Sequence, residues 1–323
     1  MREVAFIKQN RDKWIVYEKV ISGAVKKTPD EMADMYVQLI NDLSFAQTYY
    51  PKSKLTKYLN YLSAQIYQKV YKTKRYEQNK FARFFKVDVP LTVYAHRKYV
   101  YFSFVVFAIF ISIGAISSAY DDTFVRLILG DAYVNMTLEN IRNGDAMAVY
   151  QGSSGWGSSF GITINNLSVG LRCFLYGIAG GVGTLLIVIY NAIMIGSFQQ
   201  FFYQEDVFME SIRGVWLHGS MEIFAIVIEA AAGFILGASI LFPKTYSRFN
   251  SLKIGFKNSF KIYISTIPFT VFAGLIEGYI TRYAQAMPDI LNYLIIFGTL
   301  GLISYYYLVY PKKVYKKINV NHV

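Results

Sequence analysis

The stretch YVYFSFVVFAIFISIGAISSA at residues 99–119 decides the kind of fold that this chain adopts. It contains no charged side chain, and the nearest charges flank it at Lys98 and Asp121. A helix needs about 20 mostly apolar residues to cross the hydrocarbon core of a bilayer. The segment therefore predicts a transmembrane helix with well-marked ends.

Four more apolar segments follow. Residues 216–242, 260–281 and 290–310 are each long enough to cross a membrane, and 172–198 is apolar but rich in glycine, a residue that weakens and bends helices. Charged residues make up 17% of the chain, whereas soluble domains carry about 25%. The sequence predicts an all-α, polytopic α-helical membrane protein with its membrane domain over 99–310.

Residues 1–98 have a different composition, with 19 Lys and Arg against 9 Asp and Glu. Apolar residues recur at helical spacing, and Thr28, Pro29 and Glu31 form a helix-start signature. We expect a basic, helical, cytoplasmic domain whose apolar stripes form either a bundle core or a partner-docking groove. In a chain anchored in a membrane, the positive charge favours membrane lipids as partners, and no nucleic-acid-binding motif is present.

The distribution of charge also predicts orientation. Lys and Arg concentrate in cytoplasmic segments, which places residues 1–98, the stretch 244–261 and the basic tail 311–323 inside the cell. The stretch 120–171 carries five acids and two arginines and is predicted to be an external insertion. Both termini are therefore expected to be cytoplasmic.

These assignments leave a question of parity, because five crossings cannot return the tail to the cytoplasm. One alternative is that 172–198 is re-entrant and leaves four crossings. The other is five full crossings with one basic loop on the wrong side. We expect a loop in the Gly/Ser-rich stretch 151–160, and a short interfacial helix over 161–171 that carries Asn165 and Asn166.

Ionisable side chains within the apolar segments suggest a functional site, because such groups are costly in a membrane. His218, Glu222 and Glu229 fall within a stripe of about 40° on one helix. The other polar residues that we place in this intramembrane cluster are Glu277, Arg282, Asn191 and Arg172. Three interpretations stay open: structural pairing between helices, a transport or proton-coupled site, and a metal site.

The metal signal is limited to His218 and Glu222, which are four residues apart. A zinc site commonly needs more ligands, and the chain has no HExxH motif. We therefore predict no metal and no cofactor. The glycine-rich stretch GIAGGVGT at 177–184 lacks the lysine of a phosphate-binding loop. No catalytic residue is predicted.

Two pairs of glycines have the spacing of close helix packing. They are Gly233 with Gly237, and Gly274 with Gly278. This spacing suits packing within one chain or a face that forms a homo-oligomer.

The order of motifs resembles the stage II sporulation protein M family over most of residues 1–310. The resemblance rests on FIKQNRDKW at 6–14, Asn165-Asn166, the glycine-rich stretch 174–184, HGSME at 218–222, and LIEG at 275–278. Ala192 stands where the family usually has glycine. The basic N-terminal domain is longer than in the sporulation form.

This resemblance implies a polytopic protein of the bacterial inner membrane. It also implies envelope proteins as partners, such as a MoxR-type ATPase or cell-wall enzymes. We expect a non-enzymatic scaffold or component of an envelope- or peptidoglycan-remodelling assembly. The alternatives are a transporter or lipid-handling protein that uses the His/Glu cluster, and an intramembrane metalloenzyme.

Overall fold

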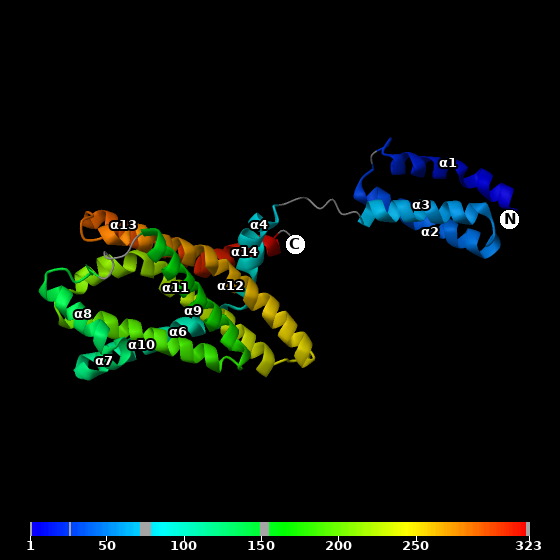
Figure 1. Ribbon diagram of the computed structural model, residues 1–323. Coiled ribbons are helices and arrows are strands. Elements are labelled where there is room, and N and C mark those ends of the chain that lie inside the picture. Colours follow the sequence, from blue (N-terminus) through cyan, green and yellow to red (C-terminus); the bar gives the residue numbers. More distant parts are fainter. Residues whose placement is uncertain (1, 26, 72–78, 149–154, 321–323) are drawn as a thin grey trace. The chain divides into compact units, whose positions relative to one another are not determined.

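The computed structural model describes residues 2–25, 27–71, 79–148 and 155–320 (Figure 1). It consists of two compact units, Met1–Lys80 and Phe81–Val323. The described residues form helices and no β-strand, so the predicted all-α class is confirmed.

The first unit contains α1 (Glu3–Ser22), α2 (Pro29–Tyr49) and α3 (Lys54–Tyr71). Helix α1 ends where Gly23 adopts a left-handed conformation, and α2 begins with the capping box of Thr28 and Glu31. Apolar side chains from all three helices form a core, whose most buried members include Leu39, Ala46 and Leu59. Trp14 in α1 donates a 2.8 Å hydrogen bond to Asp42 in α2.

The second unit begins with a short helical approach to the first apolar span. It comprises α4 (Lys80–Arg83), the π-helical turn η1 (Phe84–Asp88) and α5 (Val89–Ala95), followed by α6 (Arg97–Tyr120). Two amphipathic helices, α7 (Asp122–Leu129) and α8 (Asp131–Arg142), come next and pack against the C-terminal end of α10.

The segment between α8 and α11 forms a helical hairpin. Helix α9 (Gly155–Leu175) leads into the 3₁₀ turn η3 (Tyr176–Ile178), and α10 (Val182–Gln204) returns. Gly180 and Gly181 turn the chain with φ of 66° and 87°. Such values favour glycine, because a Cβ would be strained there.

This hairpin differs from three details of the sequence prediction. Of the predicted loop at 151–160, residues 151–154 lie outside the described residues, and 155–160 are helical. Residues 161–171 belong to α9 rather than to a separate helix. The apolar segment 172–198 includes parts of two helices. Hydropathy identified α10 but missed α9, which contains many small and polar residues; Ser159 and Gly170 among them are buried against other helices.

The remaining helices complete the bundle. They are α11 (Phe208–Leu241), α12 (Arg248–Tyr279), the turn η4 (Thr281–Tyr283), α13 (Asp289–Ser304), the π-helical turn η5 (Tyr305–Val309) and α14 (Tyr310–Val320). Within the part of the chain that the structure describes, five helical stretches are long and apolar enough to cross a membrane: 97–120, 182–204, 208–241, 248–279 and 289–318. Helix α11 is central, since 72% of its most apolar window is buried.

Close contacts at glycine hold α9 and the turn after it against α11 and α12. A Cβ at Gly274 or Gly278 in α12 would overlap the side chains of Thr163 or Ser159 in α9. A Cβ at Gly233 would overlap Thr184, and one at Gly237 would overlap the backbone at Gly181. All four glycines of the predicted pairs therefore lie in contacts within this chain.

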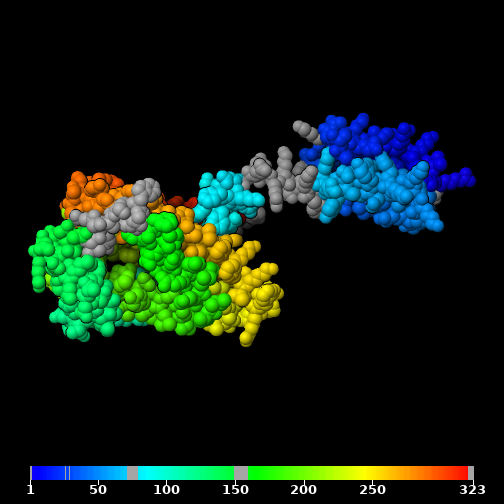
Figure 2. Space-filling model, in the orientation of Figure 1, coloured from blue at the N-terminus to red at the C-terminus, as the bar shows by residue number. Residues whose placement is uncertain are grey.

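The same contacts define how far the hairpin reaches. The start of α9 lies beside the C-terminal end of α12, and Gly180 lies beside Leu241 at the C-terminal end of α11. Helix α9 thus runs along nearly the whole bundle. Figure 2 shows the loop after α11 and the start of α12 (yellow) at one edge of the unit, where Phe242, Tyr246 and Phe249 are exposed.

Candidate functional site

Helix α11 places three ionisable side chains on the face that packs against α9 and α12. Only 4% of His218 and 2% of Glu229 are exposed, and Glu222 is half-buried. The residues of α11 between and beside them are apolar or small. Hydrogen bonds join these three side chains to α9, to α12 and to the turn η4 that follows α12.

His218 connects α11 to the C-terminal end of α12. Its Nε2 lies 3.7 Å from Oε1 of Glu277, and its Nδ1 lies 3.1 Å from Oγ1 of Thr281 in η4. The Thr281 hydroxyl also reaches the carbonyl oxygen of Ile276 at 3.3 Å. The imidazole is therefore held at Nδ1 by a hydrogen bond, while its Nε2 faces the Glu277 carboxylate.

Glu222 connects α11 to α9. Its Oε1 accepts a 2.6 Å hydrogen bond from Nδ2 of Asn166. Asn166 thus faces α11 in the interior of the bundle, whereas the neighbouring Asn165 is exposed. The prediction that both asparagines lie at the membrane interface stays a prediction.

Glu229 makes a separate contact two turns further along α11. Its Oε1 accepts a 2.7 Å hydrogen bond from the hydroxyl of Thr266 in α12. Gly170 in α9 leaves space for the carboxylate, since a Cβ there would overlap it. The polar residues of α11 therefore form two groups, one at His218 and Glu222 and the other at Glu229.

One group has the composition of a metal site. His218, Glu222 and Glu277 each offer a ligand atom, and these atoms lie within 4.8 Å of one another. A zinc-binding histidine usually has its other ring nitrogen held by a hydrogen bond, as Thr281 holds Nδ1 of His218. Glu277 was not included in the metal signal read from the sequence, because it lies on a different helix.

The other predicted members lie elsewhere. Arg172 in α9 and Asn191 in α10 line a cavity of about 370 Å³ between these two helices. Asn191 donates to the carbonyl oxygen of Ile187 in its own helix at 2.8 Å. Arg282 is half-buried in η4, directly after Thr281.

Sequence reasoning missed Thr266, Thr281 and Gly170 as parts of these groups. The two threonines look unremarkable in a helical stretch, and their role depends on which helix packs against α11. Gly170 belongs to α9, which hydropathy did not identify as a helix of the bundle.

The fold and this site define an integral membrane protein whose central helix is joined to its neighbours by buried polar side chains. Residues 103–282 match the model of the family described as Stage II sporulation protein M. The match covers more than half of the 323 residues, and the chain belongs to this family. Residues 4–72 match a family described as a domain of unknown function (DUF8413). Neither a curated protein nor a solved structure matches the chain.

Proposed function

We propose that this protein is a non-enzymatic component that assembles other envelope proteins in the bacterial inner membrane. Membership of the family and the apolar helices support a membrane location. The observation that carries the assembly role is the cavity between α9 and α10, because it presents Arg172 on an otherwise largely apolar surface.

Arg172 is exposed on the outside of the bundle, and its Nε donates to the carbonyl oxygen of Ser168 at 3.2 Å. Beside it on the cavity wall are the exposed side chains of Tyr176, Leu186 and Tyr190. Apolar side chains of this kind suit lipid or another helix, whereas the guanidinium needs an acceptor.

The depth of Arg172 makes this acceptor important. It lies between Gly170, which contacts Glu229, and Gly177, which contacts Gly233. Arg172 is therefore level with the apolar central part of α11. An exposed cation at this depth is costly unless a partner neutralises it. We propose that the partner is a transmembrane helix with a carboxylate, supplied by another envelope protein.

Crosslinked affinity purification from native membranes tests this proposal. We expect wild type to retain envelope partners, such as a MoxR-type ATPase or cell-wall enzymes, and Arg172→Gln to lose most of them. Arg142→Gln removes an exposed arginine from α8 and serves as the matched control. Equal partner yields from all three proteins would contradict the role of Arg172, and recovery of wild type without other proteins would contradict the assembly role.

We also propose that both termini are cytoplasmic and that α9 is a sixth crossing. The support is the path of α9, which extends from the C-terminal end of α12 to the C-terminal end of α11. With six crossings, residues 1–98 and the tail lie on the same side of the membrane, and their positive charge favours the cytoplasmic side. A re-entrant segment is then unnecessary.

A second candidate function is binding of a divalent cation such as Zn²⁺ at His218, Glu222 and Glu277. The support is the closeness of their ligand atoms and the hydrogen bond at Nδ1 of His218. Elemental analysis of the purified chain after incubation with Zn²⁺ and desalting tests it. Retention of about one ion that is lost in His218→Ala but kept in His96→Ala supports the site, and retention by both variants opposes it.

A transport role would require a solvated path to the same side chains. Five cavities among the described residues are lined by other parts of the bundle. The hydrogen bonds of His218 and Glu222 and the closeness of the three ligand atoms favour structural pairing and metal binding over transport.

A further inference from the structure

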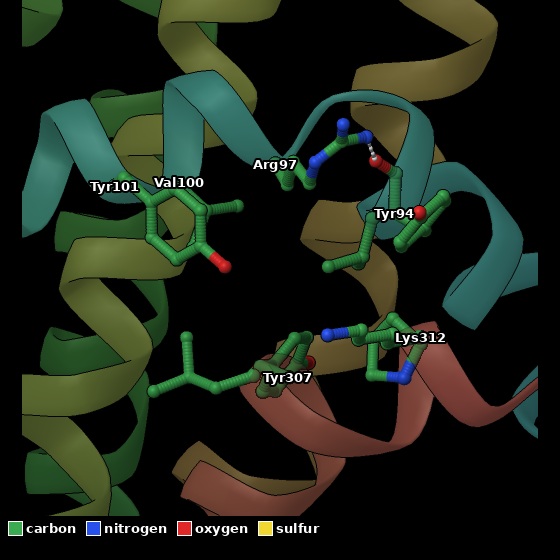
Figure 3. A pocket seen from close by; sticks show the side chains of 9 residues that line it. Tyr94, Arg97, Val100, Tyr101, Tyr307 and Lys312 are labelled. Atoms are coloured by element: carbon green, nitrogen blue, oxygen red, sulfur yellow. Dashed lines mark hydrogen bonds between the residues drawn. The ribbon is translucent and has the colours of Figure 1, made fainter.

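A second basic cavity lies between the N-terminal end of the first apolar span and the C-terminal end of the last one. It has a volume of about 280 Å³ and is lined by residues 93–101 of α5 and α6 and by residues 307–312 of η5 and α14. Figure 3 shows Arg97 on one wall and Lys312 on the other, with the Tyr101 hydroxyl pointing toward the space between them.

The position of Arg97 is fixed by its neighbour Tyr94. Its guanidinium donates a 3.0 Å hydrogen bond to the Tyr94 carbonyl oxygen and lies 4.6 Å from the centre of the Tyr94 ring (Figure 3). Tyr94 in turn stacks on Tyr315 of α14, with ring centres 4.2 Å apart. Tyr94 therefore holds the Arg97 guanidinium at the edge of the cavity, and Tyr315 of α14 holds Tyr94 in place.

The opposite wall is also well supported. Tyr307 is buried, and its hydroxyl lies 2.8 Å from the hydroxyl of Ser265 in α12. The hydroxyls of Tyr306 and Tyr310 bond to the carbonyl oxygens of Phe85 and Lys86. These contacts attach η5 and α14 to η1, so Lys312 projects from a braced helix.

The charged side chains that line this cavity are both cations, Arg97 and Lys312. The helices that carry them add Lys98 and three more lysines of the tail, and residues 89–120 and 290–323 contain no acid. The surrounding tyrosines are the kind of residue that gathers at the boundary between hydrocarbon and headgroups. The cavity thus combines positive charge, hydroxyl donors and a membrane boundary.

We propose that this cavity binds the phosphate of an anionic phospholipid. Arg97, Lys312 and the Tyr101 hydroxyl would hold the headgroup, while the acyl chains would lie against the exposed parts of Tyr101 and Leu308. Basic pockets between transmembrane helices on the cytoplasmic side are a known kind of site for anionic headgroups. The small volume admits a headgroup and leaves the chains outside.

The test measures thermal stabilisation of the full chain in neutral detergent as lipid is added. We expect phosphatidylglycerol to raise the Tm and phosphatidylcholine to raise it little. In Arg97→Gln/Lys312→Gln, the apparent affinity for phosphatidylglycerol should fall by roughly tenfold or more. Lys253→Gln/Lys257→Gln removes two exposed cations from the start of α12 and should retain the wild-type response.

Three further measurements make the outcomes decisive. Arg97→Lys keeps the charge and should retain a larger response to phosphatidylglycerol than the double glutamine variant. Inorganic phosphate added alone should not reproduce the stabilisation. Full stabilisation by inorganic phosphate would mean that the cavity binds a soluble anion and not a lipid. Native mass spectrometry should show phosphatidylglycerol retained by wild type, and equal retention by the double variant would overturn the proposal.

Discussion

Nδ2 of Asn166 in α9 lies 2.6 Å from Oε1 of Glu222 in α11. This hydrogen bond joins the two helices through residues that are 56 positions apart in the chain. Asn166→Leu removes the donor and leaves the half-buried carboxylate without this partner. We expect a loss of about 0.6–2 kcal/mol in stability, the range for hydrogen bonds between membrane helices. Thermal unfolding in detergent measures it. Asn165→Leu, at the exposed neighbouring position, should unfold close to wild type, and equal effects at both positions would contradict the role of the bond.

Gly177 lies directly against Gly233 of α11 and should not tolerate a side chain. In Gly177→Ala, the added Cβ overlaps the Gly233 carbonyl oxygen, so the turn after α9 must move away from α11. Overpacking of this kind costs about 1–3 kcal/mol. The matched control is Gly301→Ala in α13, where no atom lies within 4 Å of the new Cβ. A Tm for Gly177→Ala at or above that of Gly301→Ala would show that this contact is looser than described.

The hairpin of α9 and α10 predicts which residues share a side of the membrane. Ala179→Cys at its turn should react with a thiol reagent from the same side as Ser247→Cys, which lies before α12. Asp206→Cys, between α10 and α11, should react from the opposite side. The native Cys173 is fully buried, so it gives little background. Labelling of Ala179→Cys and Asp206→Cys from the same side would exclude a hairpin that crosses the membrane.

Residues 1–80 should fold when expressed alone, because α1 to α3 share one apolar core. Trp14 is the only tryptophan in this fragment and reports on its unfolding in denaturant. Leu59→Ala should destabilise the fragment by about 2–5 kcal/mol, the usual cost of truncating a buried leucine. Val37→Ala, at an exposed position of α2, should change stability by about 0.5 kcal/mol or less. Similar losses in both variants would mean that Leu59 is not in the core.

The stability of this fragment should fall in acid through Glu31. Hydrogen bonds from Lys27 and from the backbone and hydroxyl of Thr28 lower the Glu31 pKa from 4.5 to about 2. Because the folded pKa is the lower one, this contribution is present above about pH 4.5 and disappears as the pH falls toward 2. Glu31→Gln should flatten the pH dependence over this interval. Asp34→Asn is the control from the same helix, and an unchanged slope in Glu31→Gln would contradict the assignment.

Much of the fold could be predicted because the bilayer imposes a simple length requirement. The segments at 99–119, 216–242 and 290–310 are predominantly apolar, and each lies within or largely within a helical stretch of the structure. Thr28 and Glu31 likewise marked the start of α2 through local chemistry. Helix α9 could not be recognised this way, because it is rich in small and polar residues and its place in the bundle depends on contacts of Ser159, Asn166 and Gly170 with other helices.

The candidate site was predictable only along α11. The spacing of His218, Glu222 and Glu229 placed them on one face, which the structure shows to be buried against α9 and α12. Nothing in that spacing could assign Asn166 to Glu222 or separate Arg172 and Asn191 from the cluster. Those relations depend on the packing of helices that are distant in sequence.

The contact between Asn166 and Glu222 also has a consequence for the order of synthesis. Helix α9 leaves the ribosome before α11, so its polar and glycine-rich face has no partner from α11 when it first emerges. The carboxylate that Asn166 needs arrives 56 residues later. The contacts that fix α9 in the bundle therefore form only after α11 has been synthesised, and the final packing of the bundle follows that step.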